Sequence, residues 1–273
     1  TLTTGDFVAM ALDAKAHGVR RVDGDILVDQ RFYDDQTTPP AFEQQPSEWA
    51  VFRAPVSAVA VNENTLTLTV RPGAAGSPAH CTFDPPGFVD AEGEVKTGEA
   101  GADSVGLALS GNGKRMSAKL SGTIGADARV VRYTRRVEDP TLLPGYVLKA
   151  AFEDIGVKVQ GDVKLTTNAK GAVISHHESE PLSAILYALG KSSDNFYAEM
   201  VFKSIAGETK ARPAVSADSA EIVQKWLAKI GANDTGVVVK NGSGLFDANR
   251  ITASSLTRLL RHAYRDSAIS AEF

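Results

Sequence analysis

The sequence has a single cysteine, Cys81, among its 273 residues. It therefore cannot form an intrachain disulfide or a Cys-x-x-Cys metal or redox site. This cysteine content is compatible with a location in the cytosol or in the bacterial periplasm. No uninterrupted apolar stretch approaches the roughly 20 residues that a membrane helix needs. No basic, apolar, small-residue signal segment opens the chain. We therefore expect no transmembrane segment within these residues.

The sequence also lacks an excess of positive charge. The 29 Lys and Arg residues are outnumbered by 33 Asp and Glu, which gives a net charge of −4, and no basic run is longer than a pair. We therefore expect no nucleic-acid partner and no anionic membrane surface. The remaining composition, 43% hydrophobic and 23% charged, is that of a globular chain with material for one large domain or two to three smaller ones.

Several short motifs suggest chemistry that their context does not support. Neighbouring His176 and His177 point to opposite sides of an extended strand, and no Cys or spaced His completes a tetrahedron, so we expect no metal and no cofactor. "SGNGK" at 110–114 lacks the spacing of a phosphate-binding loop and predicts a β-hairpin turn. "KTG" at 96–98 is a signature of penicillin-recognising serine enzymes, but its glycine- and glutamate-rich surroundings predict an exposed loop.

The chain alternates between helical and β-rich character. "TLTTGDFVAMALDAKAHG" predicts a helix capped by Thr4 and ended by Gly18, followed by strands in "VRRVDGDILVD". "EDIGVKVQGDVKL" at 153–165 repeats this pattern. Prolines and short Thr-, Val- and Leu-rich runs predict a mostly β region between them. Helices are expected at about 141–155, 181–190, 195–206, 216–231 and 252–265, the last capped by Thr252.

A polar cluster interrupts this helical part at "GKSSDNFYAEM", residues 190–200. It falls between two segments with apolar helical patterns, so Ser193 or Asp194 is expected to cap the second helix. Capping alone does not require Ser193, Asp194 and Asn195 together. The excess of polar residues makes this turn a candidate functional site.

"SSDNFYAEM" resembles the S-D-N-x-x-A-E segment of the D-alanyl-D-alanine carboxypeptidases with inserted domains, the class C low-molecular-mass penicillin-binding proteins. "HGVRRVDGDILVD", "FRAPVSAVAVNEN" and "NGSGLFDANRIT" resemble further landmarks of that family in the same order. The resemblance implies an α/β fold, a transpeptidase- or β-lactamase-like domain interrupted by β-rich inserted domains. It assigns residues 1–29 and 139–273 to the transpeptidase-like domain, partial in this chain, and 30–138 to the inserted part.

The resemblance also implies a mechanism in which the serine of an S-x-x-K motif attacks the D-Ala-D-Ala carbonyl and its lysine serves as base. Ser193 would relay the proton to the leaving D-alanine, and Asn195 would hold the substrate's backbone amide. A hydroxyl beside a basic lysine can pass on a proton, and a carboxamide can both donate and accept. Ser193 and Asn195 are thus the predicted catalytic residues, and Asn195 is also predicted to bind substrate.

Two departures from the family pattern matter. No lysine of this chain has a serine three residues before it, and no K-T-G follows Ser193. We expect the nucleophile and its lysine upstream of Thr1 and the K-T-G strand beyond Phe273, in a longer protein; loss of the catalytic ends is the alternative. The family's D-G-S-G-L-S-R is here "NGSGLFD", so Asp247 could occupy the place of a substrate-facing arginine and disfavour peptides with a side-chain carboxylate.

The sequence therefore predicts a serine-type D-Ala-D-Ala carboxypeptidase, or DD-endopeptidase, acting on peptidoglycan peptides that end in D-Ala-D-Ala and inhibited by β-lactam antibiotics. The resemblance implies a periplasmic or secreted bacterial protein. The alternative is a non-catalytic peptidoglycan-binding or scaffold protein that retains the fold.

Overall fold

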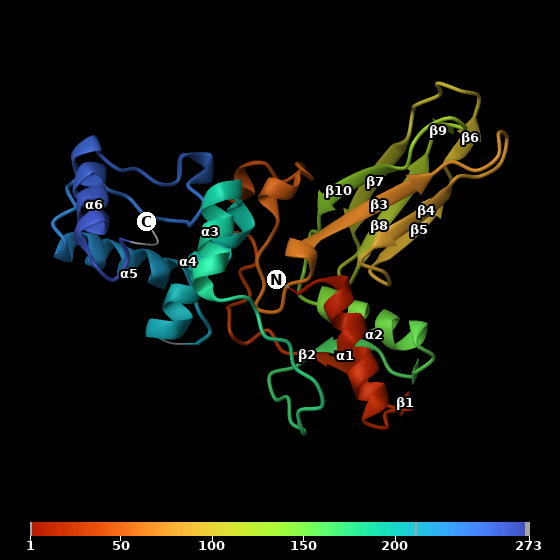
Figure 1. Cartoon of the computed structure of the whole chain (residues 1–273), viewed down its shortest axis with the longest axis horizontal. Helices are drawn as coiled ribbons and strands as arrows, with labels where there is room; N and C mark the ends of the chain where they lie inside the picture. Colours follow the sequence, from red (N-terminus) through yellow and green to blue (C-terminus); the bar gives the residue numbers. More distant parts are fainter. Residues whose placement is uncertain (1, 211, 271–273) are drawn as a thin grey trace. The chain divides into compact units, whose positions relative to one another are not determined.

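A computed structural model describes residues 2–210 and 212–270 of the chain (Figure 1). It contains both α-helices and several β-sheets, which confirms the mixed α/β fold class. The chain divides into two compact units: unit 1 is Thr1–Gln30 with Trp49–Ser179, and unit 2 is Arg31–Glu48 with Glu180–Phe273. These units differ from the segments 1–29, 30–138 and 139–273 because the first strands pair with strands near residue 160. The assignment of those segments to a transpeptidase-like domain and its insertions stays a prediction.

Unit 1 contains a layer built from two similar helix-strand-strand segments. β1 pairs in parallel with β11, and β2 pairs in parallel with β12. α1 packs against α2 (Figure 1). The two similar sequence patterns are therefore two copies of one motif that bind each other. The elements are α1 (Thr4–Ala16), β1 (Arg21–Val22), β2 (Ile26–Val28), α2 (Leu143–Asp154), β11 (Lys158–Val159) and β12 (Val163–Leu165).

Local chemistry fixes the ends of these segments. α1 is capped by Thr3 and not by the predicted Thr4, because the Thr3 hydroxyl accepts from the Asp6 backbone while the Asp6 carboxylate accepts from the Thr3 backbone at 2.7 Å. Gly18 ends the turn after α1 with φ of +99°. Between the copies, a Cβ on Gly161 would lie 2.3 Å from the Gly24 carbonyl oxygen. The glycine-aspartate turns therefore allow the two copies to approach closely.

Apolar side chains from both copies form the main core of unit 1. Phe7 and Ala11 of α1 pack with Leu143 and Val147 of α2 over the buried strand residues. Helical spacing on α1 and α2 places these residues on one face of each helix. The core therefore requires both copies, although more than a hundred residues separate them in the sequence.

The rest of unit 1 is the predicted β-rich region. Its sheets have the strand orders β10-β3-β4, β5-β8-β7 and β6-β9, and β3 alternates half-buried and buried residues as a strand with one core face does. Three 3₁₀ turns precede β3: η1 in unit 2, and η2 and η3 in unit 1. The bounds are η1 (Phe42–Gln44), η2 (Val51–Arg53), η3 (Asn62–Asn64), β3 (Thr65–Arg71), β4 (His80–Asp84), β5 (Val89–Gly93), β6 (Lys96–Gly98), β7 (Gly106–Gly111), β8 (Met116–Ser121), β9 (Thr123–Gly125) and β10 (Val131–Arg136).

Two motif interpretations can be checked in this region. "SGNGK" lies at the turn between antiparallel β7 and β8, so the predicted hairpin is confirmed. The K-T-G residues 96–98 form β6, and the prediction of an exposed loop is wrong. Thr97 is 1% exposed, and its hydroxyl accepts from the Gly73 backbone at 2.9 Å. The threonine thus has a structural partner within unit 1.

Unit 2 is mainly helical, and its first segment, Arg31–Glu48, packs against helices that follow much later in the sequence. Tyr33 pairs with Ala214 in a parallel β-bridge, and its hydroxyl lies 2.7 Å from the Ser204 hydroxyl. Ser219 of α5 accepts from the Ala206 backbone of α4 at 3.1 Å. The elements are α3 (Leu182–Ser192), α4 (Asn195–Thr209), α5 (Ser216–Lys229), η4 (Leu245–Asp247) and α6 (Ala253–Arg265). All five helices from α2 to α6 were predicted, and Thr252 caps α6 as expected.

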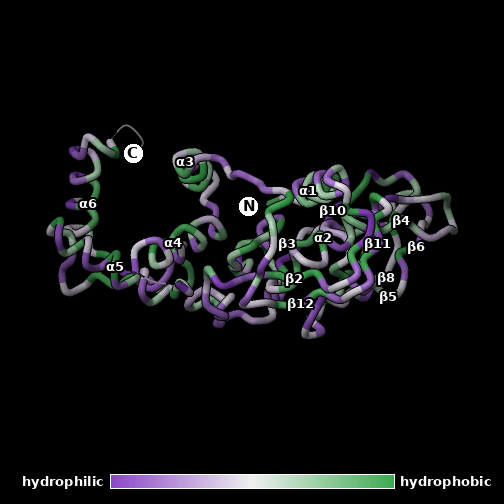
Figure 2. The backbone as a smooth tube through the Cα atoms, turned by 90° about the horizontal axis from the view of Figure 1, so that it is seen from below, coloured by the Kyte–Doolittle hydropathy of each residue, from purple (hydrophilic) through white to green (hydrophobic). Residues whose placement is uncertain are grey.

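α3 is hydrophobic but exposed. Much of its trace is coloured as hydrophobic in Figure 2, yet within the described part of the chain none of its residues is buried. Leu182, Leu186 and Tyr187 are all exposed. Among the described residues, no helix combines the length and the apolar character needed to cross a membrane.

Candidate active site

The S-D-N segment, Ser193 to Asn195, forms the turn between α3 and α4. α3 ends at Ser192, and Ser193 has a left-handed backbone with φ of 53°. Asp194 then caps α4, because its carboxylate accepts from the Tyr197 backbone at 2.9 Å. The prediction that Ser193 or Asp194 caps the helix is therefore confirmed for Asp194.

The other two residues of the segment have different positions. Ser193 is exposed at the turn, and Asn195 is half-buried as the first residue of α4. A left-handed serine costs on the order of 1 kcal/mol or more, and such conformations gather at functional sites. The structure thus places Ser193 as an exposed residue at the turn between α3 and α4 of unit 2.

Glu199, the glutamate of S-D-N-x-x-A-E, is a candidate site residue that the sequence reasoning did not single out. It lies one helical turn after Asn195 and is 2% exposed. Its carboxylate accepts from the Gly242 backbone at 3.0 Å, the Ser243 backbone at 2.8 Å and the Ser243 hydroxyl at 2.6 Å. A charged residue at helical spacing from the apolar residues Phe196 and Phe202, on the face that packs inward, was the signal that could have identified it.

Glu199 therefore joins α4 to the 241–247 loop, the "NGSGLFD" segment. Burial raises the pKa of the Glu199 carboxyl, and the hydrogen bonds from Ser243 and Gly242 act in the opposite direction. Two of the four segments that resemble the carboxypeptidase family, "SSDNFYAEM" and "NGSGLFDANRIT", are thus in direct contact through a buried carboxylate.

Side-chain amides shape the 241–247 loop. Asn241 is 2% exposed, accepts from the Gly244 backbone at 2.9 Å and donates to the Pro40 carbonyl at 2.9 Å. Asn249 accepts from the Lys240 backbone at 2.8 Å and donates to the Asn241 carbonyl at 2.8 Å. An aspartate at 241 could not donate to Pro40. The asparagine that departs from the family's D-G-S-G pattern therefore has a structural role.

Phe246 and Asp247 are adjacent at the end of the loop but lie in different environments. Both have left-handed backbones, with φ of 59° and 51°. The Phe246 ring packs edge-on against buried Phe42 at 5.3 Å between centroids, whereas Asp247 is exposed. The predicted substrate-binding carboxylate is thus presented at the surface by a loop whose two ends are anchored within unit 2.

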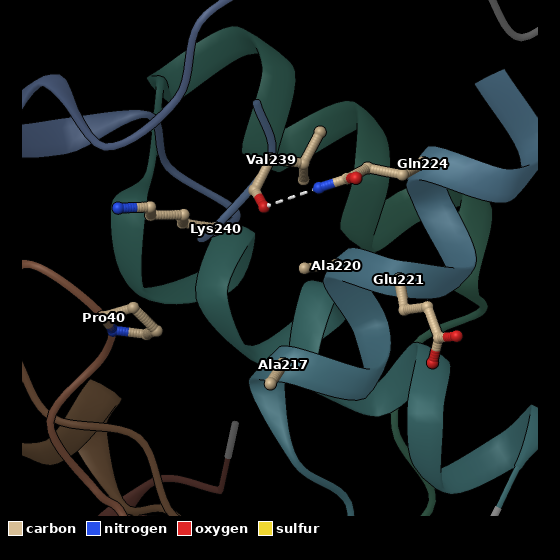
Figure 3. Close-up of a pocket in the computed structure, with 7 residues that line it drawn as sticks. All are labelled: Pro40, Ala217, Ala220, Glu221, Gln224, Val239 and Lys240. Carbon is tan, nitrogen blue, oxygen red and sulfur yellow. Dashed lines mark hydrogen bonds between the residues drawn. The ribbon is translucent and has the colours of Figure 1, made fainter. Parts of the chain in front are cut away.

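A cavity of about 370 Å³ lies beside α5 and the residues that precede the loop (Figure 3). Gln224 reaches across it to the Val239 carbonyl at 3.3 Å. Glu221, on its rim, already pairs with Lys225 at 2.6 Å and Lys210 at 3.2 Å. Within the described residues, the lining does not include the three predicted site residues, so we do not assign the candidate site to it.

The histidine motif lies in unit 1, on a segment that runs beside α1. His177 lies 3.4 Å from the Asp6 carboxylate, and His176 lies 3.8 Å from that of Glu178. Over residues 2–210 and 212–270, no group of three or more His, Cys, Asp or Glu side chains is arranged to hold a metal.

Solved structures share this fold. Penicillin binding protein 4 (dacB) from Haemophilus influenzae superposes with a TM-score of 0.74 at 18% identity, and covers 100% of this chain and 61% of its own. The same protein in complex with a β-lactam gives a TM-score of 0.67 at 19% identity, over 100% of this chain and 59% of its own.

Sequence comparison defines the family. The model of the D-Ala-D-Ala carboxypeptidase 3 (S13) family matches residues 1–272. The chain therefore belongs to the S13 family of serine peptidases, and the predicted family membership is confirmed. A D-alanyl-D-alanine carboxypeptidase of Actinomadura sp. (strain R39) is 31% identical over 96% of this chain and 50% of its own length. The carboxypeptidase DacB of Haemophilus influenzae is 20% identical over 96% of this chain and 55% of its own. The chain thus spans about half the length of these relatives.

Proposed function

We propose that this chain is part of a serine-type D-Ala-D-Ala carboxypeptidase that acts on peptidoglycan stem peptides through an acyl-enzyme and is inhibited by β-lactams. The observation that carries the proposal is the S-D-N turn, where exposed Ser193 and helix-starting Asn195 flank the capping residue Asp194. Family membership supports it, as does the similarity to two D-alanyl-D-alanine carboxypeptidases.

In this proposal, Ser193 relays a proton to the leaving D-alanine and Asn195 holds the substrate amide. Neither residue is needed to cap α4, because Asp194 does so. The proposal requires a nucleophilic serine and its lysine from outside these 273 residues, since S-x-x-K does not occur in them. Peptidoglycan peptides and β-lactams are the proposed partners, and a periplasmic or secreted location follows from that substrate.

The intact mass of the complete protein, measured before and after incubation with benzylpenicillin, tests this function. The expected result is one covalent adduct per chain, which digestion then localises to a serine of an S-x-x-K motif. A full-length protein without that motif and without an adduct contradicts the proposal. That result would favour the second candidate, a non-catalytic peptidoglycan-binding scaffold that retains the fold.

Asp247 is proposed to lie where the substrate side chain binds. We expect Asp247→Arg to raise kcat/KM for peptides with a diaminopimelate side chain by about two- to fivefold, because an exposed charge pair contributes up to about 1 kcal/mol. A peptide with lysine in place of diaminopimelate is the matched control and should not gain. Equal kinetics of variant and wild type on both peptides would remove Asp247 from the binding site.

A further inference from the structure

The contact between Glu199 and the 241–247 loop is unusually specific for a helix-loop contact. Both carboxylate oxygens are used: Oε2 accepts from the Gly242 backbone, and Oε1 accepts from the backbone and the hydroxyl of Ser243. All three distances lie between 2.6 and 3.0 Å. Two successive backbone N–H groups aimed at one carboxylate form a small anion-binding turn. The loop therefore recognises a negative charge carried by α4.

Close packing reinforces this recognition. A Cβ on Gly242 would lie 2.2 Å from the Ala198 carbonyl oxygen, so the loop backbone rests directly on α4. Further along, Phe246 packs against Phe42, and the Gln44 side chain donates to the Phe246 carbonyl at 3.3 Å. The loop is thus held at both ends, and Glu199 of α4, the helix that begins with Asn195, holds the end at Gly242 and Ser243.

Position along the helix gives this contact a functional consequence. Residues four apart on a helix are neighbours on one face, so Glu199 lies one turn below Asn195. Burying a carboxylate is costly, and an apolar contact would hold a loop without that cost. A charged anchor gives instead a defined orientation, because its acceptor atoms fit only one arrangement of the donors.

We infer that Glu199 is a positioning residue that sets the 241–247 loop, and with it Asp247, relative to Asn195, and so controls which peptide side chains are accepted. This inference rests on the proposed function. It predicts that Glu199 affects which peptides bind but does not affect acylation by a β-lactam. A β-lactam nucleus has no stem-peptide side chain for the loop to contact.

The test is Glu199→Gln in the complete protein. Glutamine keeps the size of the side chain but replaces one acceptor oxygen with a donor that opposes a loop N–H. We expect the KM for D-Ala-D-Ala peptides carrying a full stem side chain to rise about tenfold or more, with kcat within about threefold, because a loop that has lost one of its three hydrogen bonds to α4 no longer holds Asp247 in one position relative to Asn195. Benzylpenicillin acylation should stay within about threefold of wild type.

Two further variants separate this role from a purely structural one. Ser243→Ala removes one of the three donors and should raise KM in the same direction by a smaller factor. Glu208→Gln changes an exposed carboxylate on the same helix and should leave KM unchanged. Equal losses of peptide turnover, β-lactam acylation and thermal stability in Glu199→Gln, or an unchanged KM, would overturn the inference. Failure of wild-type protein to form any adduct would instead overturn the proposed function.

Discussion

Replacing Ser193 with alanine in the complete protein is expected to slow acylation by benzylpenicillin a hundredfold or more. Positioned acid-base groups contribute roughly 10²–10⁴-fold to a reaction, and Ser193 is exposed at the α3–α4 turn with its hydroxyl available for such a relay. The substitution removes no side-chain cap, because Asp194 caps α4, and residue 193 ends α3 through its backbone N–H, which donates to the Leu189 carbonyl. The variant should therefore fold normally and fail specifically in proton transfer.

Rates of adduct formation, followed by mass spectrometry under single-turnover conditions, measure this effect. Ser192→Ala is the matched control, since it removes a neighbouring exposed serine that belongs to α3. We expect the control to acylate at the wild-type rate. If Ser193→Ala also acylated at the wild-type rate, Ser193 would have no place in the mechanism.

Replacing Lys203 with alanine is expected to weaken unit 2 by about 3–5 kcal/mol, the usual cost of breaking a buried ion pair. Lys203 is 1% exposed on α4, pairs with Asp34 at 2.5 Å and donates to the Gln36 carbonyl at 2.7 Å. Its ammonium also lies 5.2 Å from the centre of the Tyr33 ring. Alanine leaves the Asp34 carboxylate without its partner and opens a cavity between segment 31–48 and α4.

Amide hydrogen exchange of peptides from segment 31–48 and from α4 reports this loss locally. Exchange should accelerate by about 10²–10³-fold or more, because the expected loss of unfolding free energy corresponds to a rise of that size in the population of the open state. Lys225→Ala, which breaks an exposed pair with Glu221, should change exchange by less than about tenfold. Lys203→Met combined with Asp34→Asn should recover part of the protection. Equal exchange in Lys203→Ala and Lys225→Ala would contradict the role of the buried pair.

Local signals in the sequence predicted the elements of this fold well. Helix periodicity and caps located α2 to α6, and glycine-aspartate turns located β1 and β2 and their later copies. The cap of α1 was misplaced by one residue because Thr3 and Thr4 are equivalent as isolated hydroxyls, and only the reciprocal contact with Asp6 selects Thr3. The glycine- and glutamate-rich surroundings of Lys96–Gly98 predicted a loop, because they carry no sign of the pairing with β9, which follows later in the chain.

The candidate site was predicted only in part. The polar excess at Ser193–Asn195 was visible in the sequence, since such residues interrupt two helical patterns. The contact of Glu199 with Gly242 and Ser243 joins positions more than forty residues apart, and no spacing rule connects them. Likewise, the partner of Lys203 is Asp34, and such a distant pair becomes evident only after the chain has folded.

The paired copies in unit 1 impose an order on synthesis and folding. β1 and β2 leave the ribosome more than a hundred residues before the strands that complete them, β11 and β12. During that interval the apolar face of α1 has no α2 to cover it. The intervening antiparallel strands, such as β7 and β8, form contacts of low sequence separation and can close first. The β-rich region thereby shortens the effective loop between the two copies, which lowers the entropy lost when they meet.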